Sequence, residues 1–121
     1  MNTDNIIITL TKDFALRIIK LYQYLAEDKK EHVLSKQILR SGTSIGANVR
    51  ESINAQSKAD FVNKMNIALK EANETQYWLE LLKESNYITS PQFDSIYADN
   101  GKIVVTLVKI VKSAKKAPTK P

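Results

Sequence analysis

The side chains that could support acid–base chemistry or hold a metal are His32, Glu71, Glu74 and Glu80. Catalysis of this kind needs paired groups at close range, and His32 is the only histidine, in a segment that we expect to be a loop. No Glu-x-x-His motif occurs, which argues against a di-iron bundle site, and the absence of cysteine excludes thiolate metal sites and disulfides. We interpret the three glutamates as a solvated helix face, and we predict no catalytic residue, no metal and no cofactor.

The segment 40–51 is rich in small residues and contains two of the three glycines, Gly42 and Gly46. It lacks the Gly-Lys-Ser/Thr ending of a phosphate-binding loop. Helical spacing instead runs through it, because Ile38, Gly42, Ile45 and Val49 recur at steps of four and three. Each glycine inside a helix costs about 1 kcal/mol relative to alanine. We therefore predict that the two glycines, one turn apart on one face, let another helix approach closely.

The same spacing predicts three helices in the first 90 residues. We expect the first to be capped by Thr11 and the second to run from a Ser35 cap to about Gln56. The third follows Ser57 and Asp60, which form a capping-box pattern. Its apolar seam alternates strictly between steps of four and three, through Phe61, Met65, Ala68, Ala72, Thr75, Leu79 and Leu82.

A fourth helix is predicted from Ser90, as cap, and Pro91 in the first turn. It carries two apolar stripes, one through Phe93, Tyr97, Val104, Leu107 and Val111 and one through Ile96, Ile103 and Ile110. The alternative is a turn at 99–101 followed by a strand, since 103–108 is rich in strand-forming residues. We favour a helix with a bend near Gly101.

Four long helices with short connections predict an all-α, antiparallel up-down-up-down bundle as a single domain over 1–116, followed by a disordered tail at 117–121. Matching the levels of the helices places Gly42 and Gly46 against the first or the third helix, with Phe14 and Ile18 at the same height. No apolar run approaches the roughly 20 residues that span a bilayer, so we expect a cytoplasmic protein without a membrane partner.

The apolar stripes are broader than a monomer needs, and two aromatic residues lie beside the third helix's seam. Off-seam aromatics are common at protein interfaces, so we expect a homo-oligomer, although lysine stems could cover the same surface in a monomer. Asn48 would fix helix register if it is buried, and is otherwise an exposed residue. The candidate packing or interface residues are Gly42, Ile45, Gly46, Asn48, Tyr77 and Trp78.

The net charge of +5 is concentrated at the C-terminal end, since residues 102–121 hold six lysines and no acid. This asymmetry indicates an anionic partner such as structured RNA or DNA, or else a solvated helix end whose lysines suit the helix dipole. No aromatic residue follows Tyr97, so base stacking among the lysines is not supported. The candidate nucleic-acid-binding residues are Lys102, Lys109, Lys112, Lys115, Lys116, Arg40 and Arg50.

Several motifs together resemble a known family. The run at 39–51 resembles the signature of the bacterial four-helix-bundle proteins named after the intervening sequences of 23S ribosomal RNA genes. The similarity covers about residues 12–88 and continues through Phe14-Ala15, Ile18-x-Lys20-Leu21, Ser57-x-x-Asp60-Phe61, Lys64-Met65-x-Ile67-Ala68-Leu69-Lys70-Glu71-Ala72 and Glu74-Thr75-x-Tyr77-Trp78-Leu79-x-Leu81-Leu82.

The resemblance implies an antiparallel four-helix bundle that assembles as a homopentamer and is associated with RNA or the ribosome. The family includes the accessory variability determinant proteins of diversity-generating retroelements, which bind nucleic acid and a reverse transcriptase through basic surfaces. We therefore expect a non-enzymatic, RNA-associated accessory protein. The alternative is a structural scaffold that binds a protein partner, such as a reverse transcriptase, without contacting nucleic acid.

Overall fold

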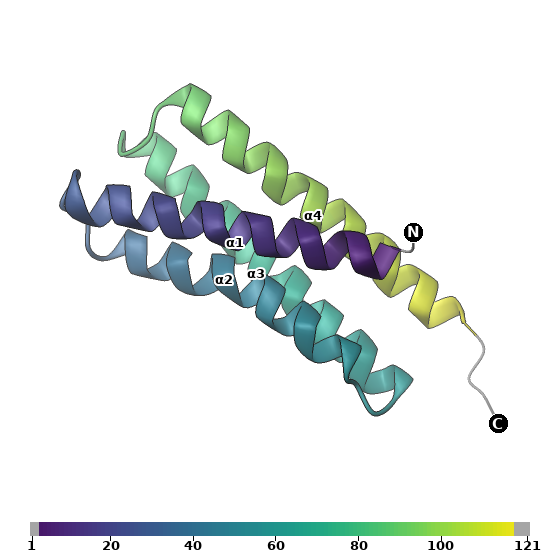
Figure 1. The fold of residues 1–121 in the computed structure, drawn as a ribbon. Helices are drawn as coiled ribbons and strands as arrows, with labels where there is room; N and C mark the ends of the chain where they lie inside the picture. The colour runs from purple at the N-terminus through teal and green to yellow at the C-terminus, as the bar shows by residue number, and fades with distance from the viewer. Residues whose placement is uncertain (1–2, 118–121) are drawn as a thin grey trace.

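The computed structural model describes residues 3–117, and over these residues the chain is all-α, with four helices and no strand (Figure 1). The helices are α1 (Thr3–Glu27), α2 (Leu34–Ile53), α3 (Lys58–Glu84) and α4 (Ser90–Lys116). None of them has the length of apolar residues that crossing a membrane requires. The tail predicted over 117–121 lies outside the described residues from residue 118 onward.

Each helix packs on two others, in the cyclic order α1, α2, α3, α4, and the α1–α4 pair has the smallest contact. The backbones of the helices on the two diagonals, including α2 and α4, do not approach one another closely over the described residues. In the contacts between α3 and α4, residue numbers increase along one helix as they decrease along the other. The Lys58 side chain reaches the Lys115 carbonyl, and the Asn100 side chain reaches the Ala72 carbonyl. All four helices therefore enclose one shared core.

The core contains one stripe from each helix, and the α3 seam is the most regular. Six of its seven predicted members are buried, and the seventh, Phe61, is half-buried. Thr75 can lie there because its hydroxyl donates to the Glu71 carbonyl and contacts the Ser41 hydroxyl of α2 at 2.9 Å. Every polar group of this pair is therefore satisfied where water is excluded.

The first helix begins at Thr3, nine residues before the start that a cap at Thr11 would give, so the predicted cap is wrong. Thr11 lies inside α1 with 1% of its surface exposed, and its hydroxyl donates to the Ile7 carbonyl at 2.8 Å. A threonine with this bond inside its own helix is tolerated in a core. The extension places Ile7 in the core, where it is 1% exposed.

The second helix is capped by a residue from the preceding loop, so the predicted Ser35 cap is also wrong. The Glu31 carboxylate accepts the backbone N–H of Ser35 at 2.7 Å and that of Val33 at 3.2 Å. Ser35 instead donates its hydroxyl to the Glu31 carbonyl at 2.7 Å. The helix ends at Ile53, three residues before the predicted Gln56.

The N-terminal caps of α3 and α4 lie within one residue of their predicted positions. Ser57 caps α3 and accepts the N–H of Asp60, as predicted. For α4 the cap is Thr89 rather than Ser90, because Thr89 and Gln92 form a reciprocal capping box with Pro91 in the first turn. A cap one residue earlier leaves the predicted helix essentially unchanged.

The region around Gly101 is helical, so the strand alternative is wrong. No glycine of the described chain has a positive φ angle, and α4 is continuous from Ser90 to Lys116. Its two apolar stripes are both used within the chain, because α4 packs against α1 and α3 at once. Ile96, Ile103 and Ile110 are buried, whereas Tyr97 packs toward α3. The double stripe on this helix is therefore no sign of surplus apolar surface.

The glycines of α2 face α1, which decides between the two predicted neighbours. A Cβ built on Gly42 would lie 2.8 Å from Cγ1 of Ile18, and one on Gly46 would lie 3.3 Å from Oγ1 of Thr11. Ile18 is completely buried. The prediction that these glycines permit a close helix–helix approach is confirmed.

Candidate functional site

The C-terminal lysines form a stripe along the outer side of α4. At 100° per residue, Lys102, Lys109, Lys112 and Lys116 fall within an arc of about 80°. All four side chains are exposed, and Val105, which is 55% exposed, lies within the same arc. The buried residues of α4 lie on the opposite side of the helix. We call these four residues the lysine stripe.

The ammonium groups of this stripe form no ion pair with the described side chains, which are those of residues 6–117. The ion pairs found there are Arg17 with Asp99 at 2.7 Å and Lys64 with Glu51 at 3.3 Å, and neither involves the stripe. The Lys115 side chain is also exposed but lies outside the arc, toward α3. Its carbonyl is one of two at the end of α4 that accept from the Lys58 ammonium, the other being that of Ala117.

The two candidate arginines do not join the lysines. Arg40 and Arg50 are exposed on α2, whose backbone does not closely approach that of α4 in the described chain. The seven predicted nucleic-acid-binding residues therefore form at least two separate surfaces. Sequence reasoning could not separate them, because charge counts carry no information on which helices lie diagonally.

The predicted acidic face is not uniformly solvated. Glu80 accepts a hydrogen bond from the Tyr97 hydroxyl at 3.0 Å, and Gln76 donates to the same hydroxyl at 2.6 Å. Burial, together with the contact to Glu80, raises the pKa of Tyr97. This network joins α3 to α4, so for Glu80 the interpretation as a solvated residue is wrong.

Glu71 also departs from that interpretation, since its Oε2 atom is covered and has no hydrogen-bond partner. Burial raises the pKa of this carboxyl, the neighbouring Glu74 raises it further, and Arg40 and Lys70 oppose the shift. A signal was present in the sequence, because Ile67, Glu71, Glu74, Trp78 and Leu81 repeat the steps of four and three beside the core seam. All five are half-buried.

The predicted interface aromatics lie on this flank of α3 and on the adjoining outer surface. Tyr77 is 54% exposed, and its ring centroid lies 5.2 Å from that of Trp78. The Trp78 indole Nε1 is covered without an acceptor. Ile45, by contrast, is fully buried in the core and is unavailable to any partner.

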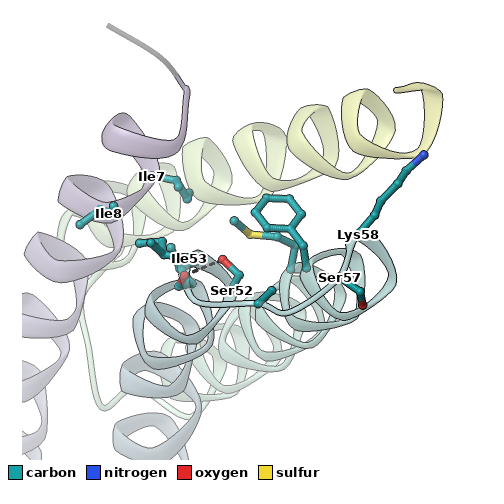
Figure 2. Close-up of a pocket in the computed structure, with 10 residues that line it drawn as sticks. Ile7, Ile8, Ser52, Ile53, Ser57 and Lys58 are labelled. Carbon is teal, nitrogen blue, oxygen red and sulfur yellow. Dashed lines mark hydrogen bonds between the residues drawn. The ribbon is translucent and has the colours of Figure 1, made fainter. Parts of the chain in front are cut away.

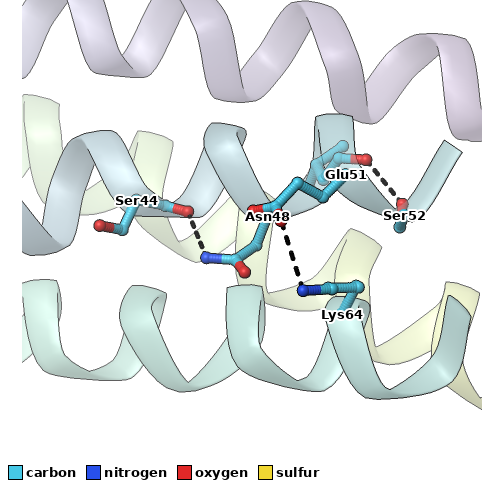
Figure 3. Close-up of polar contacts among 6 residues, drawn as sticks. Ser44, Asn48, Glu51, Ser52 and Lys64 are labelled. Carbon is cyan, nitrogen blue, oxygen red and sulfur yellow. Dashed lines mark hydrogen bonds and ion pairs between the residues drawn. The ribbon is translucent and has the colours of Figure 1, made fainter. Parts of the chain in front are cut away.

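Asn48 is half-buried on the side of α2 that faces α3, and it bonds locally. Its amide donates to the Ser44 carbonyl at 2.9 Å, while Lys64 of α3 reaches Glu51 one turn further along (Figure 3). A bond within its own helix does not fix the register between helices. The fully buried asparagine is Asn100, which sequence reasoning missed because it belongs to neither apolar stripe of the predicted fourth helix.

A hollow of about 450 Å³ opens at the end of the bundle where α2 joins α3 (Figure 2). Its lining is mostly apolar, and the Lys58 ammonium points away toward the end of α4. No group of three histidine, aspartate or glutamate residues in the described chain could hold a metal. The hollow therefore offers no free charged group, and the lysine stripe remains the most distinctive polar surface.

Comparison with known proteins gives a consistent result. A family model described as 23S rRNA-intervening sequence protein matches residues 3–109. A crystal structure from Bacteroides thetaiotaomicron, described as a protein of unknown function from the S23 ribosomal protein family, superimposes with a TM-score of 0.91. That protein is 57% identical, and the alignment covers 92% of this chain and 99% of that one. No curated protein is significantly similar to this chain.

Proposed function

We propose that this chain, which belongs to the family of 23S rRNA-intervening sequence proteins, is a non-enzymatic accessory protein that binds structured RNA through the lysine stripe. The main observation in support is that Lys102, Lys109, Lys112 and Lys116 lie on one exposed face of α4. None of them forms an ion pair with the described acidic side chains. A row of ammonium groups along a helix follows a phosphate backbone, and its binding energy comes mainly from counterion release.

The proposal extends to assembly and location. We propose an antiparallel up-down-up-down bundle that forms a homopentamer in the bacterial cytoplasm and associates with RNA or the ribosome. The opposed numbering of the α3–α4 contacts supports the helix order. Six C-terminal lysines per chain would give a pentamer about 30 positive charges at these ends, which multiplies a weak backbone-directed affinity.

The test measures binding of a structured RNA at several salt concentrations. Lys109→Gln with Lys112→Gln should weaken binding and flatten the salt dependence by about 1.4–1.8 units of slope, since each phosphate contact contributes roughly 0.7–0.9. The matched control is Lys36→Gln with Lys70→Gln, which removes two exposed charges from α2 and α3. Equal losses in both variants, or no binding of the unaltered protein at low salt, would contradict the proposal.

A second candidate function is a scaffold for another protein, and the half-exposed Tyr77 beside Trp78 favours it. In this alternative the partner, such as a reverse transcriptase, covers the aromatic pair, and RNA is not contacted directly. Pull-downs with and without nuclease separate the two functions. A partner that survives nuclease and the Lys109/Lys112 double substitution, but is lost with Tyr77→Ala, supports the scaffold.

A further inference from the structure

A shallow hollow lies on the outer side of the α1–α2 pair, where the close helix contact leaves small side chains at the surface. It has a volume of about 180 Å³ and is lined by Thr11, Lys12, Ala15, Thr43, Gly46, Ala47 and Arg50. Lys12 and Arg50 are exposed, and neither forms an ion pair with the described side chains of residues 6–117. We call this surface the α1–α2 hollow. It combines a floor of small residues with two free positive charges.

One turn beyond the hollow, apolar side chains extend the surface at both ends. Ile19 follows Ala15 on α1 and is 37% exposed, and Ile53 follows Arg50 on α2 and is 50% exposed. Residues three or four apart share a helix face. The hollow is therefore positive and shallow at its centre and apolar toward its ends, a pattern that fits a helix with acids at its middle.

The chain carries a helix face of that kind on the flank of α3. Ile67, Glu71, Glu74, Trp78 and Leu81 form a half-buried row at steps of four and three, here called the α3 ridge. Its apolar ends, Ile67 and Leu81, are about 21 Å apart at 1.5 Å per residue. Its centre holds the two glutamates, and neither forms an ion pair over the described residues.

Two atoms of the α3 ridge lack partners within a single chain. Glu71 Oε2 and Trp78 Nε1 are both covered from solvent and make no hydrogen bond. A covered, unbonded polar group costs roughly 1–3 kcal/mol, more when it is charged. Small side-chain shifts on docking would let a cation approach Glu71 and reduce the free-energy cost of its buried, unbonded oxygen. The two atoms therefore mark a surface where a second molecule could supply the missing polar partners.

We propose that the α3 ridge of one copy packs into the α1–α2 hollow of the next copy, with Glu71 and Glu74 facing Lys12 and Arg50. This proposal deepens the self-association proposed above and rests on it. Ridge and hollow are different surfaces of the same chain, so the contact is head-to-tail, and in the pentamer proposed above it closes into a ring. The α4 helix, diagonal to α2, lies outside both surfaces and keeps its lysine stripe free for RNA.

The absence of cysteine from the sequence allows a direct cross-linking test. Ala47→Cys places a thiol in the hollow, and Glu74→Cys places one on the ridge while leaving Glu71 in place. After mixing and exchange of the two single variants, a short bis-maleimide should link one to the other. Neither variant should link to itself. Gly101→Cys, which adds a thiol on the exposed side of α4, is the matched control and should stay unlinked with Ala47→Cys.

Charge reversal provides the second measurement. Arg50→Glu alone and Glu74→Lys alone should each lower the mass in light scattering toward the 13.7 kDa of one chain, with unchanged helical circular dichroism. Both substitutions in one chain should restore assembly, because every contact then pairs the reversed charges. Assembly of the unaltered protein without the 47–74 cross-link would overturn this interface but leave self-association standing. An unaltered protein that keeps the 13.7 kDa mass of one chain at all concentrations would overturn both this interface and the proposed self-association.

Discussion

Gly42 of α2 lies so close to Ile18 of α1 that a Cβ at this position would lie 2.8 Å from Cγ1 and 2.9 Å from Cγ2 of the isoleucine. Real Cβ atoms do not come this close to a neighbour, and Ile18, with none of its surface exposed, has no free space to move into. The contact fixes the separation of α1 and α2 at this level. It also explains why the chain accepts a glycine in mid-helix.

Gly42→Ala is therefore expected to destabilise the protein, even though alanine is the better helix former. Overpacking a well-packed core costs about 1–3 kcal/mol, against a gain of about 1 kcal/mol in helix propensity. Gly42→Leu should cost more or prevent folding. The matched control is Gly101→Ala, which meets nothing within 4 Å and should be stabilising by up to about 1 kcal/mol. Thermal melts of the three variants check the prediction, and a raised melting temperature for Gly42→Ala would contradict it.

The sequence predicted this packing because glycine spacing, helix periodicity and turn positions all pointed to the same level. It placed Ile18 and the glycines at one height, and it gave the α3 seam residue by residue. It failed where polar residues lie inside the bundle. Thr11 was predicted as a helix cap, and neither Glu31 nor Asn100 was predicted to be buried, because none of the three belongs to an apolar stripe. Each is buried through specific hydrogen bonds that only the fold reveals.

The candidate sites were predictable in composition but not in arrangement. The lysines of α4 form one stripe because their spacing is helical, which the sequence contains. The exclusion of Arg40 and Arg50 from that stripe follows from α2 and α4 lying on a diagonal, a property of the whole bundle. In the same way, the second apolar stripe of α4 indicated apolar surface beyond what one chain buries. In the fold that stripe is buried, because α4 packs against both α1 and α3.

Asn100 is a buried polar residue whose replacement should raise stability. Its side-chain amide donates to the Ala72 carbonyl at 3.0 Å, but its Oδ1 atom is covered and unbonded. Asn100→Leu removes the unpaired oxygen, whose burial costs roughly 1–3 kcal/mol, and loses one hydrogen bond worth about 1 kcal/mol. We expect an equal or higher melting temperature with less specific α3–α4 packing, seen as broadened amide resonances in this region. A large loss of stability would show that the Ala72 contact dominates.

Glu31 makes α2 stability dependent on pH. Burial raises the pKa of its carboxyl, but the backbone N–H groups of Ser35, Leu34 and Val33 outweigh that effect and hold it below the usual value of 4.5. Because the folded pKa is the lower one, this stabilisation is complete above the unfolded pKa and is lost as the pH falls through the folded pKa. Glu31→Gln should cost about 0.5–2 kcal/mol at pH 7, typical of a lost helix cap, and little at low pH.

Denaturant titrations between pH 7 and pH 3 test this prediction against Glu27→Gln, an exposed residue at the end of α1. The Glu31→Gln variant should show a flatter acid limb than the unaltered protein, whereas Glu27→Gln should follow it. Parallel pH profiles for the Glu31→Gln variant and the unaltered protein would show that the carboxylate does not cap α2.

Glu71 should have the opposite effect on pH dependence within a single chain. Burial first, and Glu74 second, raise its pKa above 4.5 in the folded state, so folding favours the protonated form. Stability is then greatest below the unfolded pKa and falls as the pH rises through the folded pKa. Glu71→Gln, measured in the Arg50→Glu background to keep the chain unassembled, should therefore melt higher at pH 7 and equally at pH 4. Glu84→Gln, at an exposed position of α3, should melt unchanged at both. A Glu71→Gln chain that melts at a lower temperature at pH 7 would mean that Arg40 and Lys70 already stabilise the charged carboxylate within one chain. A cation from a second copy would then not be needed to stabilise Glu71 in the α3 ridge.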